Sequence, residues 1–106
     1  MNAQFRDRWV AALRSGKFEQ GRYRLRSSED KYCCLGVACE VARIGGDYQR
    51  GWDYDVEWMY DGHVGTLSYD VASALGIDGN HVEMLASMND NGKSFGEIAA
   101  WIEENC

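Results

Sequence analysis

The sequence predicts a single small domain of the α+β class, spanning residues 1–106, with about five helices and short antiparallel hairpin strands. Segments with helical spacing of apolar residues alternate with segments in which every second residue is apolar. The last third of the chain also contains three short segments, each preceded by a helix-capping residue. With 106 residues, 45% of them hydrophobic, the chain is long enough to bury one core.

The first helix is predicted over residues 3–15. Four apolar residues fall on one helix face at i, i+4, i+7 and i+8 spacing: Phe5, Trp9, Ala12 and Leu13. Asn2 is placed to cap the amino end, and Gly16 is placed to end the helix.

An arginine-rich strand is predicted over residues 21–26, GRYRLR, because two kinds of side chain alternate along it. One face carries Arg22, Arg24 and Arg26, and the other carries Tyr23 and Leu25. The polar sequence SSED predicts a turn, after which KYCCL is expected to pair back as a hairpin. A short buried helix is then predicted over residues 35–44, ended by the glycine pair at 45–46.

A second alternating strand, WDYDVEW, is predicted over residues 52–58. Its polar face carries Asp53, Asp55 and Glu57, and its apolar face includes Trp52 and Trp58. The dipeptide DG at 61–62 predicts a hairpin turn, with HVGTL as the partner strand. The acids are interpreted either as a solvated face or as partners of the arginine strand across a sheet.

Three short helices are expected to complete the domain. The predicted caps are Ser68, Asn80 and Ser94, and Glu83 and Glu97 are placed to form capping boxes with the second and third of them. Gly76 and the DNG turn at 90–92 are expected to end the first two helices.

Four cysteines raise the question of a metal or redox site. Cys33, Cys34 and Cys39 lack the paired C-x₂₋₄-C spacing of zinc ligands, and no C-x-x-C redox motif is present. We therefore expect no metal or cofactor and interpret these thiols as small apolar core residues. An enzyme would need a cleft joining Cys33 or Cys34 to His63 or His81, and we do not predict one.

Charge is distributed unevenly along the chain. Residues 1–31 carry 8 Lys/Arg and 4 Asp/Glu, whereas residues 32–106 carry 3 and 13, which gives +4 and −10 and the total of −6. The acidic remainder would repel phosphate, so direct nucleic-acid binding is not expected. The same acidity suits a surface that occupies a basic channel of another protein.

Two stretches carry a resemblance: WVAALRSGKFEQGRYRLR followed by YCCLGVACEVA in the first part of the chain, and LASMNDNGKSFGEIAAWIEE near the end. They resemble a group of small uncharacterised proteins of tailed bacteriophages and prophages. The resemblance implies a phage-type origin. Small accessory proteins of phages often inhibit host or defence proteins, including CRISPR complexes.

The leading hypothesis is therefore a non-catalytic, anti-CRISPR-like inhibitor that binds a host or defence protein through an acidic and aromatic surface. The predicted contact residues are Trp52, Asp53, Asp55, Glu57, Trp58 and Asp61. The alternative is a binder that sequesters a nucleotide signal, in which arginines hold phosphates and a tyrosine stacks on the base. Its predicted residues are Arg22, Tyr23, Arg24 and Arg26.

The location expected from the sequence is the cytoplasm, which is that of the host cell if the protein is phage-encoded. The first residues, MNAQFRDRWV, have a polar helical pattern and lack the apolar run of a signal peptide. No apolar stretch approaches the roughly 18 residues that a membrane-spanning helix needs, so no membrane association is expected.

Overall fold

A computed structural model describes residues 1–50 and 56–106. Within these ranges it contains five helices and two sheets of two strands each, which confirms the predicted α+β class. The helices are α1 (Ala3–Arg14), α2 (Cys34–Val41), α3 (Tyr69–Leu75), α4 (Gly79–Asp90) and α5 (Phe95–Asn105). The strands are β1 (Glu19–Gln20), β2 (Lys31–Tyr32), β3 (Gly46–Arg50) and β4 (Val56–Tyr60).

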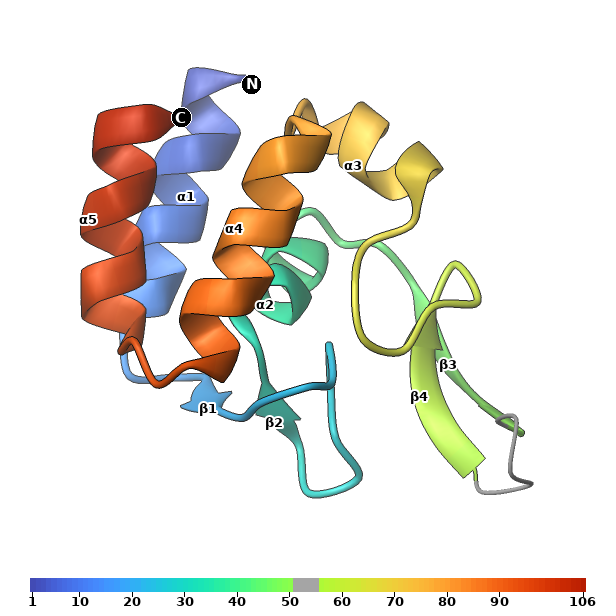
Figure 1. Ribbon diagram of the computed structural model, residues 1–106. Coiled ribbons are helices and arrows are strands. Elements are labelled where there is room, and N and C mark those ends of the chain that lie inside the picture. Colours follow the sequence, from blue (N-terminus) through green and yellow to red (C-terminus); the bar gives the residue numbers. More distant parts are fainter. Residues whose placement is uncertain (51–55) are drawn as a thin grey trace.

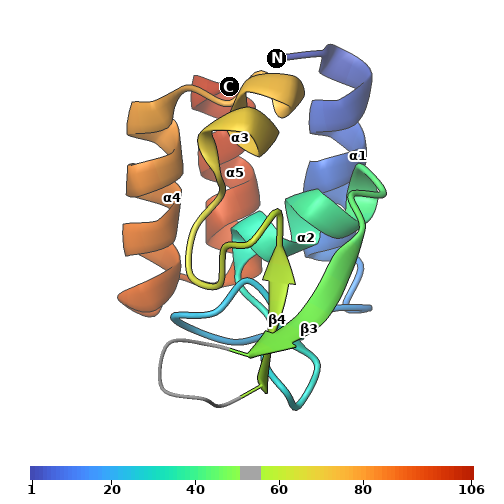
Figure 2. The same ribbon diagram turned by 90° about the vertical axis from the view of Figure 1, so that its right-hand side faces the viewer.

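The helices form the body of the domain, and the β3–β4 hairpin extends from one side of it (Figure 1). Helix α1 packs against α5 and α2, α4 packs against α2 and α5, and α3 packs against α4. Figure 2 shows α2 lying between α1 and α4. Because α2 is enclosed in this way, its residues from Cys34 to Cys39 are all buried. In the described part of the chain, no helix is both long and apolar enough to cross a membrane.

Three of the predicted helices are confirmed by their caps. Asn2 Oδ1 accepts the backbone N–H of Gln4 at 2.8 Å, and the positive φ of Gly16 (76°) follows the end of α1. Ser68 caps α3, and Gly76 ends it in the left-handed conformation. Ser94 and Glu97 form the predicted capping box of α5. These features depend on neighbours in sequence, which is why local patterns were sufficient.

Helix α4 begins earlier than predicted. Asp78 caps it by accepting the backbone N–H of Asn80 at 2.8 Å, so Asn80 lies inside the first turn. The prediction of Asn80 as the cap, with Glu83 completing a capping box, was therefore wrong. Asp and Asn are comparable N-caps, and here the aspartate comes first along the chain.

The arginine-rich strand predicted at 21–26 does not form. Leu25 is fully buried and donates its backbone N–H to the carbonyl of Val64, whereas Tyr23 is 62% exposed and has a φ of 67°. The two residues therefore do not share a face. Tertiary contacts override the alternation, because the Leu25 carbonyl lies directly against the Cα of Gly36 in α2.

The turn at 27–30 is present. Arg26 and Tyr32 form an antiparallel bridge across it, and the Ser27 N–H donates to the Lys31 carbonyl at 2.8 Å. Strand β2 pairs in parallel with β1, an arrangement that the sequence did not predict.

Helix α2 ends at Val41 and not at the glycine pair. Arg43 takes the left-handed conformation with a φ of 57°, and the Ile44 N–H donates to the Cys39 carbonyl at 2.9 Å. This six-to-one hydrogen bond is the Schellman arrangement, here with arginine where glycine is usual. Gly46 instead begins β3, where the Trp58 indole packs so closely that a side chain would not fit.

Strand β4 covers the end of the predicted strand 52–58, but its partner was predicted wrongly. It pairs with β3 in antiparallel register, with Tyr48 opposite Trp58. Asp61 and Gly62 form the predicted turn, both with positive φ, and His63 bridges Tyr60. HVGTL does not continue as a strand, because the Val64 carbonyl bonds to Leu25 instead.

Candidate functional site

The arginine segment and the acidic strand, which the sequence offered as two separate sites, partly neutralise each other. Arg24 Nε lies 2.8 Å from Glu57 Oε1, and Arg26 pairs with Asp30 at 2.8 Å. The Arg26 guanidinium also stacks over the Trp58 ring, with its central carbon 4.1 Å from the ring centre. One arginine and one acid of the two predicted faces, Arg24 and Glu57, therefore do pair, but not across a sheet, because residues 21–26 do not form a strand.

The four residues proposed to hold a nucleotide are not gathered on one surface. Arg24 and Arg26 already have carboxylate partners, and Arg22 extends toward Gly92 at the end of α4. The backbone N–H of Tyr23 donates to Asp90 at 2.9 Å, and its ring is exposed. A nucleotide would have to displace Glu57 and Asp30 to meet two of the arginines, so nucleotide binding remains an unsupported prediction.

Aromatic rings line the inner side of the hairpin. Trp58 makes edge contacts with Tyr48 and Tyr60, at ring-centre distances of 4.8 and 6.1 Å. Tyr60 is buried and donates its hydroxyl to Glu40 at 2.9 Å. Burial raises the pKa of Tyr60, so this hydroxyl stays protonated. These contacts attach the hairpin to the helical body and explain the position of Trp58 without a partner.

The predicted partner-binding set is only partly described. Trp52, Asp53 and Asp55 lie outside the described residues. Of the others, Glu57 and Trp58 are engaged by arginines, as above. Asp61 is exposed and accepts the Ser68 hydroxyl at 2.7 Å, which places its carboxylate at the start of α3.

Helix α3 is flanked by two hollows. One, of about 490 Å³, lies between α3 and α4 and has a floor of Leu67, Ala72, Ile77 and Val82. Tyr69 and Glu83 also line it, and the Tyr69 side chain is 85% exposed. The other hollow, of about 390 Å³, includes Asp61 and Asp70 among its lining residues.

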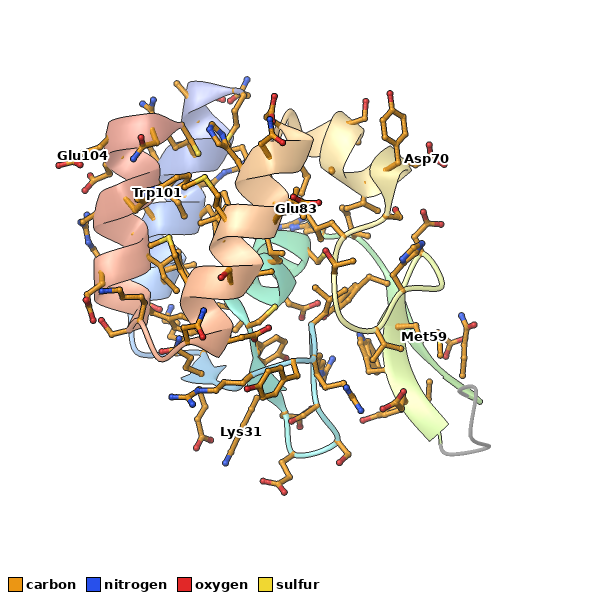
Figure 3. The ribbon with its side chains drawn as sticks, viewed as in Figure 1. Lys31, Met59, Asp70, Glu83, Trp101 and Glu104 are labelled. Atoms are coloured by element: carbon orange, nitrogen blue, oxygen red, sulfur yellow. The ribbon has the colours of Figure 1, made fainter. Side chains whose placement is uncertain are left out.

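We call the surface around α3 the acidic face and define it by Asp61, Tyr69, Asp70 and Glu83. Among the described residues, neither Asp70 nor Glu83 has a salt-bridge or hydrogen-bond partner through its side chain. Asp70 projects outward from α3 and Glu83 from α4 (Figure 3). Since the chain has no Lys or Arg between Arg50 and Lys93, this surface lacks nearby cations from its own segment.

The acidic face was missed because prediction concentrated on alternating segments. The signal that could have found it is the long stretch without Lys or Arg after Arg50. A second signal is Tyr69, which follows the cap Ser68 at the first position of α3. A side chain there is free to face solvent while Val71 and Ala72 turn inward.

The cysteines of α2 and its cap are core residues, as predicted. Cys33, Cys34 and Cys39 are at most 3% exposed. Burial raises the pKa of Cys33 to about 11 and that of Cys39 to about 12, and it also raises that of Cys34. Thiols of this kind are protonated at neutral pH and make poor nucleophiles.

The two histidines do not complete a site with these cysteines. His81 lies beside Cys106, with Nδ1 3.6 Å from Sγ, and stacks edge-on against Trp101. His63 is exposed in the turn that follows β4. Burial raises the pKa of Cys106, so its thiol is not activated by this contact. Over residues 1–50 and 56–106, no three His, Cys, Asp or Glu side chains converge to hold a metal ion.

Comparison with known proteins gives one finding on family. The model of a family described as a domain of unknown function, DUF8296, matches residues 1–83, from α1 into the first turns of α4. No curated protein matches the chain, and no solved structure matches it.

Proposed function

The chain belongs to the DUF8296 family, a domain of unknown function, and we propose that it is a non-catalytic binding protein that inhibits a host or defence protein by docking its acidic face on a basic surface. The observation that carries this proposal is the acidic face itself. It combines exposed acids without a cation partner, an exposed aromatic ring and a hollow. Hollows and aromatic anchors are typical of protein-binding surfaces.

Most of the other acids among the described residues already make contacts within the fold. Asp78 caps α4, Asp90 accepts the backbone of Tyr23, and Glu103 pairs with Arg14 at 2.6 Å. Within the described ranges, Asp70 and Glu83 are not used in this way, so their charge is available to a partner. Complementary charge speeds association and selects the partner more than it adds affinity.

This proposal moves the contact surface relative to the one predicted from the sequence. Tyr69, Asp70 and Glu83 replace Glu57 and Trp58 in the proposed contact surface. Glu57 is paired with Arg24, and the Trp58 ring is covered by Arg26. Asp61 belongs to both surfaces. The inhibitory role and the CRISPR-type target rest on the resemblance to small uncharacterised phage proteins and on the roles that small accessory proteins of phages often have.

The buried thiols support a binding role over a catalytic one. A nucleophilic cysteine needs access and a lowered pKa, and the three cysteines around α2 have neither. The proposal therefore assigns no reaction to this chain.

The test is a plating assay in a bacterium whose CRISPR system restricts a phage. Expression of the wild-type chain is expected to raise the efficiency of plating, and the double reversal Asp70→Lys/Glu83→Lys is expected to abolish the effect. Glu104→Lys is the matched control, since Glu104 is exposed on α5, on the opposite side of the view from Asp70 (Figure 3). Restriction unchanged by the wild-type chain would refute the CRISPR target.

The docking surface is tested separately by quantitative capture of partners from host lysate. The Glu104→Lys variant should still capture a host protein with a basic surface, whereas the Asp70→Lys/Glu83→Lys variant should not. Equal capture by a folded double reversal would contradict the use of the acidic face.

A further inference from the structure

The hollow between α3 and α4 is lined by both small residues and branched apolar side chains. Ala72 and Ser73 of α3 and Gly79 at the start of α4 line it, with Leu67, Ile77 and Val82 among the lining residues. The hollow has a volume of about 490 Å³. This volume lies within the range of ligand-sized cavities and is ample for one large side chain.

Polar groups stand at the rim of this apolar hollow. Glu83 and Ser73 are exposed lining residues, and the Tyr69 ring is almost wholly exposed. An apolar floor favours an aromatic or aliphatic group, whereas a carboxylate at the rim favours a cation beside it. The combination therefore selects a chain segment with both chemistries at neighbouring positions.

We infer that the α3–α4 hollow receives one aromatic side chain of a partner segment in which Lys or Arg residues flank that side chain. This inference rests on the proposed function and specifies the partner's chemistry at the same surface. The aromatic group is buried against Ala72, Ile77 and Val82, and one flanking cation faces Glu83 at the rim. Asp70 lines the neighbouring hollow of the acidic face, where it attracts the basic segment at longer range.

A second copy of this chain is a poorer occupant. Its net charge is −6, so two copies of the chain repel each other. Charge complementarity favours a basic partner.

The test uses two synthetic peptides with identical Lys-rich flanks, one with a central Phe and one with a central Ala. Binding to the whole protein is followed by fluorescence anisotropy. The Phe peptide is expected to bind about tenfold or more tightly than the Ala peptide, which corresponds to burial of one aromatic side chain. Equal affinity of the two peptides for the wild-type protein would overturn the inference.

The hollow is then filled by Ser73→Trp, a change at an exposed position of α3 that leaves all charges in place. This variant should bind the Phe peptide no better than the Ala peptide. Ala11→Trp, at an exposed position of α1, is the matched control and should keep the tenfold preference. A preference that survives in Ser73→Trp, with its fold verified by circular dichroism, would also overturn the inference.

Charge reversal separates this inference from the function on which it rests. Asp70→Lys/Glu83→Lys should weaken both peptides alike. If it does so while the wild-type protein shows no preference for the Phe peptide, docking through the acidic face is supported and the aromatic occupant of the hollow is refuted. If the wild-type protein binds neither peptide at low salt, both the hollow and the acidic face fail.

Discussion

Asn89 is the residue whose removal should harm the fold most for its size. It is a fully buried polar side chain that joins α4 to two other segments, residues 20–21 and the start of α2. Its Oδ1 accepts the Cys34 N–H at 3.2 Å and the Gln20 amide at 3.0 Å, and its Nδ2 donates to the Gly21 carbonyl at 2.8 Å. Among the described residues, the N-cap residue of α2 supplies no side-chain cap, so Asn89 satisfies the first turn of that helix from a distance.

The cost of Asn89→Ala follows from the groups that it leaves unpaired. The Gln20 amide keeps its bond to the Lys93 carbonyl at 2.7 Å, so it loses little. The Cys34 N–H is buried and loses its partner, at about 1–3 kcal/mol, and the partly buried Gly21 carbonyl adds about 1 kcal/mol. The total is about 2–4 kcal/mol out of the roughly 5–15 kcal/mol by which a domain of this size is stable.

The assay is urea unfolding followed by tryptophan fluorescence and circular dichroism. Asn89→Ala should lower the free energy of unfolding by about 2–4 kcal/mol with an unchanged m-value. Asn91→Ala is the matched control, because Asn91 is exposed and its side chain donates only to Ser87 at 3.1 Å among the described residues. It should change stability by less than about 0.5 kcal/mol. A loss below about 1 kcal/mol for Asn89→Ala would show that this hydrogen-bond network does not hold the segments together.

Three further predictions concern the core and the charges. Gly36→Ala should destabilise the protein by about 1–3 kcal/mol or more, because the new Cβ would overlap the backbone carbonyl of Leu25. Gly96→Ala, on the open surface of α5, should stabilise the protein by up to about 1 kcal/mol. Denaturant midpoints measure both changes. In the native protein at pH 8, a thiol reagent should modify the partly exposed Cys106 first, slowly because burial raises the pKa of its thiol, and the three buried cysteines only after unfolding. Reaction of all four cysteines at the same rate would contradict the burial described above. Glu57→Lys should lower the free energy of unfolding by up to about 1 kcal/mol and leave partner binding intact. Glu83→Lys should leave the free energy of unfolding unchanged and weaken partner binding. The same loss of binding in both variants would contradict the distinction between neutralised and available acids.

The parts of the fold that the sequence predicted correctly are those set by neighbouring residues. The caps at Asn2, Ser68 and Ser94 bond to backbone groups two or three positions away, so a local pattern contains the whole interaction. The turn at Asp61 and Gly62 is local in the same sense. Such features depend little on the rest of the chain.

The errors arose where distant segments decide the local conformation. The alternation in GRYRLR is a strand pattern, but Leu25 is fixed by Val64 and Gly36, which lie 39 and 11 positions away in the printed sequence. Strand β3 was missed because Gly46 and its neighbours lack alternation and owe their conformation to pairing with β4. Strand preference reflects packing partners more than the chain itself.

The candidate site was harder to predict than the fold, for a related physical reason. A sequence pattern identifies a charge but not whether the fold already uses it. Glu57 stood out on an alternating strand and is paired with Arg24, whereas Asp70 and Glu83 stood in ordinary helices and are unpaired within the described ranges. Three-dimensional pairing therefore decides which acids can meet a partner.

The unusual motif YCCLGV is explained by the same reasoning applied to the core. The Cys34 carbonyl accepts the Trp9 indole N–H at 3.0 Å, its N–H donates to Asn89, and its thiol lies 3.5 Å from the Leu85 carbonyl. One residue of α2 thus contacts both α1 and α4 through polar bonds inside an apolar core. Where buried polar atoms are this fully satisfied, a single arrangement of the three helices is favoured over its alternatives. The residue types of the motif follow from that packing: a small side chain at Cys34 between two helices, and none at Gly36 against the Leu25 carbonyl.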